Sequence, residues 1–94
     1  MAEIEVKKSE HGDRYEFQVA VRERGGESHH RVTLRKADHE RLTGGKVSPE
    51  VLVTESFQFL LEREPKEAIL GSFDLTVISR YFPGYEREIG RRLE

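Results

Sequence analysis

Apolar and polar side chains alternate with a period of two in three stretches near the N-terminus, and this alternation constrains the fold more than any other feature. The stretches cover residues 3–7, 15–22 and 31–35. Successive side chains of a β-strand point to opposite faces of a sheet, so each stretch predicts a strand with one buried face. Glycine-containing breaks separate the stretches, which predicts an antiparallel meander with the second strand in the centre.

The two breaks also predict how the strands pair. Gly25-Gly26 can fill the two central positions of a type I′ turn, which require positive φ, and this turn sets Val19 opposite Val32. A turn at Gly12-Asp13 sets Val6 opposite Val19. Both turns bring the apolar residues to one face of the sheet. This face consists of Ile4, Val6, Phe17, Val19, Val21, Val32 and Leu34.

The other face of the predicted sheet carries charges of both signs. Glu16 is expected opposite Arg35, and one row is expected to hold Glu3, Arg22 and His29. Opposite charges on neighbouring strands attract one another. We therefore expect a solvated, charge-paired surface that also discourages the edge strands from recruiting another chain.

Helix start and stop signals follow the third stretch. Residues 36–43 predict a short helix that ends at Gly44-Gly45. A longer helix is expected to begin after Ser48, which supplies the N-cap oxygen, and to run to about Glu64. Apolar residues cover about half of its circumference, which indicates a central helix.

Three further signals divide the rest of the chain. Pro65 is expected to begin a helix on which residues 68–70 face inward, and Asp74 to cap a short helix that ends at Pro83-Gly84. A last helix follows, on which Glu88 can pair with Arg92.

The pattern as a whole predicts one α+β domain over residues 1–94. Its architecture is an N-terminal three-stranded antiparallel meander followed by three to four helices packed on one face.

Composition limits the class of protein. Charged residues make up 36% of the chain with a net charge of −2, and neither half has the run of one sign that is typical of nucleic-acid or membrane tails. The lack of cysteine excludes disulfides. The segment MAEIEVKK has no apolar signal region and no apolar run could span a bilayer, so we expect a cytoplasmic protein with no membrane partner. The lack of Asn and the excess of Arg over Lys fit a heat-adapted source or a GC-rich genome.

Two segments carry a resemblance to known proteins. FLLEREPKEAIL followed by FDLTVISRYFPGYEREI, and VTLRKADHERLTGGKVSPE upstream, resemble a pattern in small uncharacterised bacterial proteins of unknown function. The resemblance covers about residues 32–89. It implies a single-domain, cytoplasmic bacterial protein, and it implies no activity, ligand or catalytic residue.

Histidines and carboxylates are the first candidates for a chemical site. His29, His30 and His39 could approach one metal ion, but adjacent strand residues point to opposite faces, and a capping or surface role fits better. Residues 62–67 interleave three carboxylates with basic side chains, which is typical of an ion-paired helix surface. We therefore expect no catalytic residue, no metal site and no cofactor.

Basic side chains on the charged face suggest a nucleic-acid interface. The candidate residues are Arg22, His29, Arg31 and Arg35. Some three-stranded sheets place such a face in the major groove of DNA. Because Glu3, Glu5 and Glu16 share this face and repel phosphate, we rank this function second.

Aromatic residues around a helix break suggest a protein-interaction site. The candidates are Tyr81, Phe82, Pro83 and Tyr85, which could equally cover the core. With no motif for chemistry elsewhere, we favour a non-enzymatic interaction or regulatory domain that uses this cluster, with a homodimer as one form of it. Nucleic-acid binding is the alternative, and a small enzyme without a recognisable motif is third.

Overall fold

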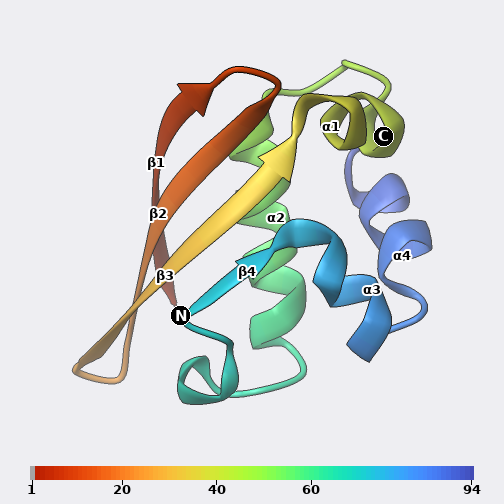
Figure 1. The fold of residues 1–94 in the computed structure, drawn as a ribbon. Coiled ribbons are helices and arrows are strands. Elements are labelled where there is room, and N and C mark those ends of the chain that lie inside the picture. The colour runs from red at the N-terminus through yellow and green to blue at the C-terminus, as the bar shows by residue number, and fades with distance from the viewer. Residues whose placement is uncertain (1) are drawn as a thin grey trace.

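The computed structural model describes residues 2–94 and has an α+β fold, with a four-stranded mixed sheet and helices that follow its first three strands (Figure 1). The elements in chain order are β1 (Glu3–His11), β2 (Arg14–Glu23), β3 (Gly26–Arg35), α1 (Lys36–Thr43), α2 (Pro49–Leu61), the 3₁₀ turn η1 (Lys66–Ala68), β4 (Ser72–Asp74), the 3₁₀ turn η2 (Leu75–Val77), α3 (Ile78–Tyr81) and α4 (Tyr85–Arg92). The order in the sheet is β1-β2-β3-β4. The strand β2 pairs antiparallel with both β1 and β3, and β4 pairs parallel with β3. The predicted meander is therefore confirmed.

The pairing of β1 with β2 is the predicted one, and that of β2 with β3 is not. Val6 faces Val19 as expected, whereas Val19 faces His30 instead of Val32. The second turn is centred on Arg24 and Gly25, whose φ values are 56° and 75°, so a type I′ turn forms one position earlier than the glycine pair suggests. The resulting shift is two residues along β3, which keeps every side chain on its predicted face.

The predicted outer-face rows that involve β3 change with this shift. Arg22 lies opposite Glu27 rather than His29, and Glu16 lies opposite Thr33 rather than Arg35.

The fourth strand was not predicted. Instead of a full helix, the residues after Pro65 form a single 3₁₀ turn and then β4, which pairs along Arg31–Thr33 of β3. The Asp74 carboxylate caps η2 as expected, and it also accepts a hydrogen bond of 2.7 Å from Thr33 Oγ1. Leu70 consequently stays exposed, contrary to its predicted inward position.

The helix signals between β3 and β4 mostly hold. The helix α1 covers the predicted residues and ends at Gly44, whose φ of 65° suits a glycine. Ser48 Oγ accepts a hydrogen bond of 3.2 Å from the Val51 amide at the start of α2. The helix α2 ends at Leu61, earlier than predicted, and the Glu88–Arg92 pair on α4 forms with a distance of 3.0 Å.

The core lies where α2 meets the apolar face of the sheet, and α2 also contacts α1 and α4 (Figure 1). Among the fully or almost fully buried residues are Phe17, Val21, Val32 and Leu34 from the sheet, Leu52, Val53, Phe57 and Phe59 from α2, and Tyr85 and Ile89 from α4. Across residues 2–94, none of the helices combines the length and apolarity needed to cross a membrane.

Candidate functional site

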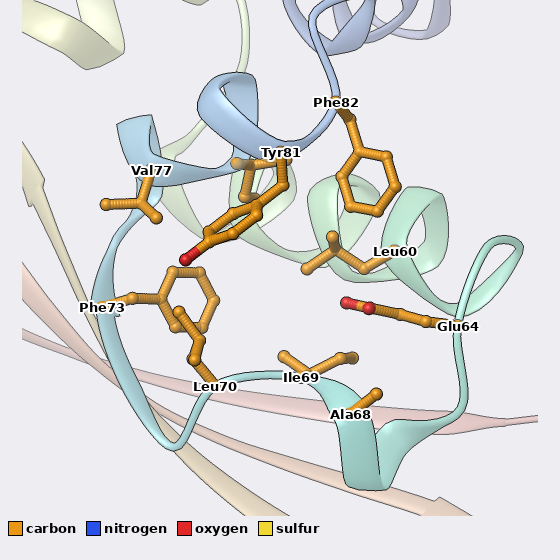
Figure 2. A pocket seen from close by; sticks show the side chains of 10 residues that line it. Leu60, Glu64, Ala68, Ile69, Leu70, Phe73, Val77, Tyr81 and Phe82 are labelled. Atoms are coloured by element: carbon orange, nitrogen blue, oxygen red, sulfur yellow. The ribbon is translucent and has the colours of Figure 1, made fainter.

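An apolar pocket of about 310 Å³ opens between the C-terminal part of α2, the segment from η1 to β4, and α3 (Figure 2). It is called the α3 pocket below. It is lined by Leu60, Glu64, Ala68, Ile69, Leu70, Phe73, Val77, Ile78, Tyr81 and Phe82.

The large apolar side chains that are exposed around the α3 pocket are Leu70 and Tyr81. They are 47% and 66% exposed, whereas Ile69 and Ile78 on its inner wall are buried. In Figure 2 the Tyr81 ring leans over the pocket, with its hydroxyl pointing toward Phe73. A hollow with a buried floor and exposed apolar side chains at its rim is typical of a surface that another molecule covers.

Contacts behind the pocket hold its walls in place. The Phe82 ring packs edge-on against Phe59 with ring centroids 5.8 Å apart, and Phe73 packs against Phe57 at 6.1 Å. The buried His30 ring is within hydrogen-bonding distance, 2.8 Å, of the Leu70 carbonyl oxygen. The core therefore fixes α3 and the chain before β4, so the pocket does not depend on loose loops.

Glu64 is the single charged residue that lines the α3 pocket. Figure 2 shows its carboxylate between Leu60 and Ile69, directed into the hollow. The neighbouring cations are engaged elsewhere: the Arg63 guanidinium lies 3.7 Å from the Phe59 ring centre, and Lys66 Nζ lies 2.7 Å from Glu67. Within residues 2–94 the Glu64 side chain makes no ion pair or hydrogen bond.

The structure separates the predicted aromatic cluster into two parts. Tyr81 and Phe82 line the α3 pocket, and Pro83 is exposed just beyond it. Tyr85 is fully buried, so its predicted place in an exposed cluster is wrong. Burial raises the pKa of Tyr85 to about 12.

Sequence reasoning missed most of the pocket because β4 forms only when it pairs with β3. For the wall between α2 and β4, the one local signal was Leu70, an apolar residue directly before Gly71.

The predicted nucleic-acid residues lie on the outer face of the sheet, where carboxylates engage most of them. Arg22 lies 2.8 Å from Glu27 and 3.3 Å from Glu5, and Arg31 lies 2.7 Å from Glu16. These hydrogen bonds raise the pKa of both arginines.

His29 also contacts Glu27, at 2.6 Å, while the exposed Arg35 has no ion pair within residues 2–94. The expected charge-paired surface is therefore present, and phosphate would have to displace the sheet's own carboxylates.

The remaining chemical candidates serve the fold. His30 bridges Ser28 and the Leu70 carbonyl, and His39 Nε2 is 2.7 Å from the Val47 carbonyl, so both are buried hydrogen-bonding residues. Within residues 2–94 no three metal-binding side chains gather at one place. The expected ion-paired helix surface over residues 62–67 forms only in part: Glu62 pairs with Arg92 at 2.5 Å and Glu67 with Lys66 at 2.7 Å, but residues 62–65 lie beyond the end of α2 and Glu64 has no ion pair within residues 2–94.

The chain matches no family model, no curated protein and no solved structure. The resemblance to small bacterial proteins stays a prediction.

Proposed function

We propose that this protein is a non-enzymatic protein-interaction or regulatory domain that binds an apolar segment of a partner in the α3 pocket. The observation that carries the proposal is the exposure of Leu70 and Tyr81, at 47% and 66%, on the rim of an apolar hollow. Covering these side chains would remove apolar surface from water, which is the main driving force for protein association.

The pocket also indicates the chemistry of its occupant. A volume of about 310 Å³ is at the small end of ligand sites, so it suits one or two bulky side chains of a peptide better than an extended cofactor. Glu64 supplies one negative charge without a cation of its own. The occupant we propose is a partner segment with a large apolar residue close to a lysine or arginine.

The lining favours binding over catalysis. Its polar groups are the Glu64 carboxylate and the Tyr81 hydroxyl, set among aliphatic and aromatic side chains. The resemblance to bacterial single-domain proteins adds the proposal that the interaction takes place in the bacterial cytoplasm.

Selection from a random peptide library displayed on phage tests the proposal. The immobilised wild-type chain should enrich peptides that combine a large apolar residue with a basic residue. Leu70→Asp and Tyr81→Ser should each weaken binding of the enriched peptides by about tenfold or more, because both remove rim contacts. Val51→Ser is the matched control, since Val51 is 42% exposed on α2 but does not line the pocket.

Glu64→Gln separates the charge from the apolar contact. This substitution should weaken the binding of the enriched peptides several-fold and reduce the salt dependence of that binding. The proposal fails if no peptide is enriched, or if the enriched peptides bind both rim variants as tightly as the wild type. Circular dichroism on each variant verifies that the fold is intact.

A further inference from the structure

The strand β1 forms one end of the sheet and pairs with β2 alone (Figure 1). His11 and Arg14 flank a two-residue turn, and such flanking residues exchange both hydrogen bonds with each other. Pairs along β1 then alternate, so the odd-numbered residues direct their N–H and C=O groups to β2. The even-numbered residues from Ile4 to Glu10 direct theirs outward, where another strand could bind.

Two side-chain features mark this edge. Ile4 and Val6, on the apolar face, are only half-buried although they border the core. Lys7, on the outer face, is exposed and makes no ion pair within residues 2–94, while the neighbouring Glu5 is shared with Arg22. The edge at β1 therefore leaves part of the apolar surface of Ile4 and Val6 exposed, and it leaves Lys7 without an ion-pair partner within residues 2–94.

A second copy of β1 complements this edge in an antiparallel register. With a two-fold axis at Val6, Val6 faces Val6 of the second copy, Glu5 faces Lys7, and Ile4 faces Lys8. Both Glu5–Lys7 contacts bring together opposite charges, and the even-numbered residues exchange the new hydrogen bonds. The two apolar faces then continue across the junction.

The neighbouring registers oppose like charges. An axis at Glu5 sets the two Glu5 side chains against each other at its centre, although it brings Glu3 opposite Lys7 further out, and an axis at Lys7 opposes two lysines. An axis at Ile4 sets Glu3 against Glu5, and an axis at Lys8 pairs two lysines. Like charges directly opposite destabilise a strand pair. An axis at Ser9 also sets opposite charges against each other, Lys8 against Glu10, but both already have partners in Glu50 and Lys36, and this axis leaves Ile4 and Val6 uncovered. The charges and the apolar residues of β1 together favour the axis at Val6.

We infer that the chain forms a two-fold symmetric dimer in which β1 pairs antiparallel with β1 of a second copy, centred on Val6. The two four-stranded sheets then join into one continuous sheet. This interface lies at the opposite end of the sheet order from β4, which borders the α3 pocket, so it is independent of the proposed peptide site. This dimer also differs from the homodimer that the sequence suggested, which would form through the aromatic residues around Tyr81 and Phe82.

Charge reversal tests the register by sedimentation equilibrium. Lys7→Glu opposes Glu5 of the second copy and should raise the dimer dissociation constant about tenfold or more. Adding Glu5→Lys reverses both members of the pair and should restore association. Lys46→Glu is the control: it changes the net charge equally, at an exposed residue between α1 and α2.

Single cysteines test the geometry, because the natural chain has none. Val6→Cys should form an intermolecular disulfide on mild oxidation, since the two residues face each other across the axis. Lys8→Cys should not, because its counterpart is Ile4. A wild-type chain that stays monomeric at high micromolar concentration overturns the inference. So does a dimer that Lys7→Glu leaves intact, or one that Leu70→Asp dissociates instead.

Discussion

The Tyr85 hydroxyl lies 2.6 Å from Ser56 Oγ, in a fully buried hydrogen bond that joins α4 to α2. Ser56 donates its own proton to the Leu52 carbonyl at 2.7 Å, so Tyr85 is the donor in this pair. The Tyr85 ring also packs against Phe59, with centroids 5.3 Å apart. One side chain thus provides both packing and polar satisfaction at this helix contact.

Removing the serine hydroxyl should destabilise the fold more than removing the tyrosine hydroxyl. Ser56→Ala leaves a buried Tyr85 O–H without a partner, which costs about 1–3 kcal/mol. Tyr85→Phe keeps the ring and leaves Ser56 bonded to Leu52, so only about 0.5–1.5 kcal/mol should be lost. Urea unfolding of the two variants measures the difference, and the reverse order would refute the assigned donor.

Alkaline pH should weaken the fold through the same residue. The pKa of Tyr85 is raised from 10.0 to about 12 by burial, so tyrosinate forms in the unfolded chain before it forms in the folded one. The stabilising effect of the neutral hydroxyl is complete below pH 10 and is lost as the pH rises through 12. The loss amounts to roughly 2–3 kcal/mol.

Tyr85→Phe supplies the control for this pH dependence. The variant lacks the titrating group, so the stability difference between the wild type and Tyr85→Phe should shrink or change sign between pH 10 and 12. A difference that stays constant over that interval would contradict the buried, neutral state of Tyr85.

The alternation in β1–β3 predicted strand identity and buried faces because side-chain direction is a local property of an extended backbone. The second turn was misplaced because the difference between two adjacent turn positions is small, and contacts outside the hairpin decide it. In the observed register His30 faces Val19 and reaches the Leu70 carbonyl, which is 40 residues away in sequence.

Most of the α3 pocket could not be predicted from the sequence either, because it also depends on contacts between residues far apart in the chain. Its wall at Phe73 belongs to β4, a strand of three residues whose existence depends on pairing with Val32. So short a segment carries no period of its own. Tyr81 and Phe82 were found because aromatic residues beside a proline are a local signal.

Arg24 offers a site for stabilisation. Its φ of 56° places a non-glycine residue in the left-handed region, at a type I′ turn position where asparagine is strongly favoured. Arg24→Asn should therefore raise the free energy of unfolding by about 0.5–1 kcal/mol. Gly25→Val should lower it by more than that, because Gly25 has φ 75°. Thermal and urea unfolding measure both, and a destabilised Arg24→Asn variant would contradict the turn assignment.

Phe59 should be among the most sensitive core positions. It is 1% exposed and its ring contacts Phe82 and Tyr85, so it connects α2 to the residue that follows α3 and to α4. Phe59→Ala should cost about 3–5 kcal/mol, enough to unfold a marginal domain. The control on the same helix is Val51→Ala, which removes an exposed side chain and should change stability by about 0.5 kcal/mol or less. Equal melting temperatures for the two variants would contradict the packing of α2.

Asp74 connects the end of β4 to its surroundings through three hydrogen bonds. Its carboxylate accepts from Thr33 Oγ1 at 2.7 Å, from Thr76 Oγ1 at 2.6 Å and from the Thr76 amide at 3.2 Å. Asp74→Ala removes the cap of η2 and the side-chain link to β3 together. A loss of about 1–3 kcal/mol is expected from hydrogen bonds to a charged group.

In Asp74→Ala, β4 should detach from β3 more readily than the whole domain unfolds, because β4 pairs over only three residues. The Arg31 amide donates to the Gly71 carbonyl at 2.8 Å, so its hydrogen exchange reports on the docking of this segment. Exchange at Arg31 should accelerate in Asp74→Ala, while that of Val19 in the central strand changes little. Thr33→Val removes one of the three bonds and should give a smaller acceleration. Because Phe73 lines the α3 pocket, Asp74→Ala should also weaken the binding of peptides selected on the wild type. If hydrogen exchange at Arg31 and peptide binding both stay unchanged, β4 is held in place without Asp74.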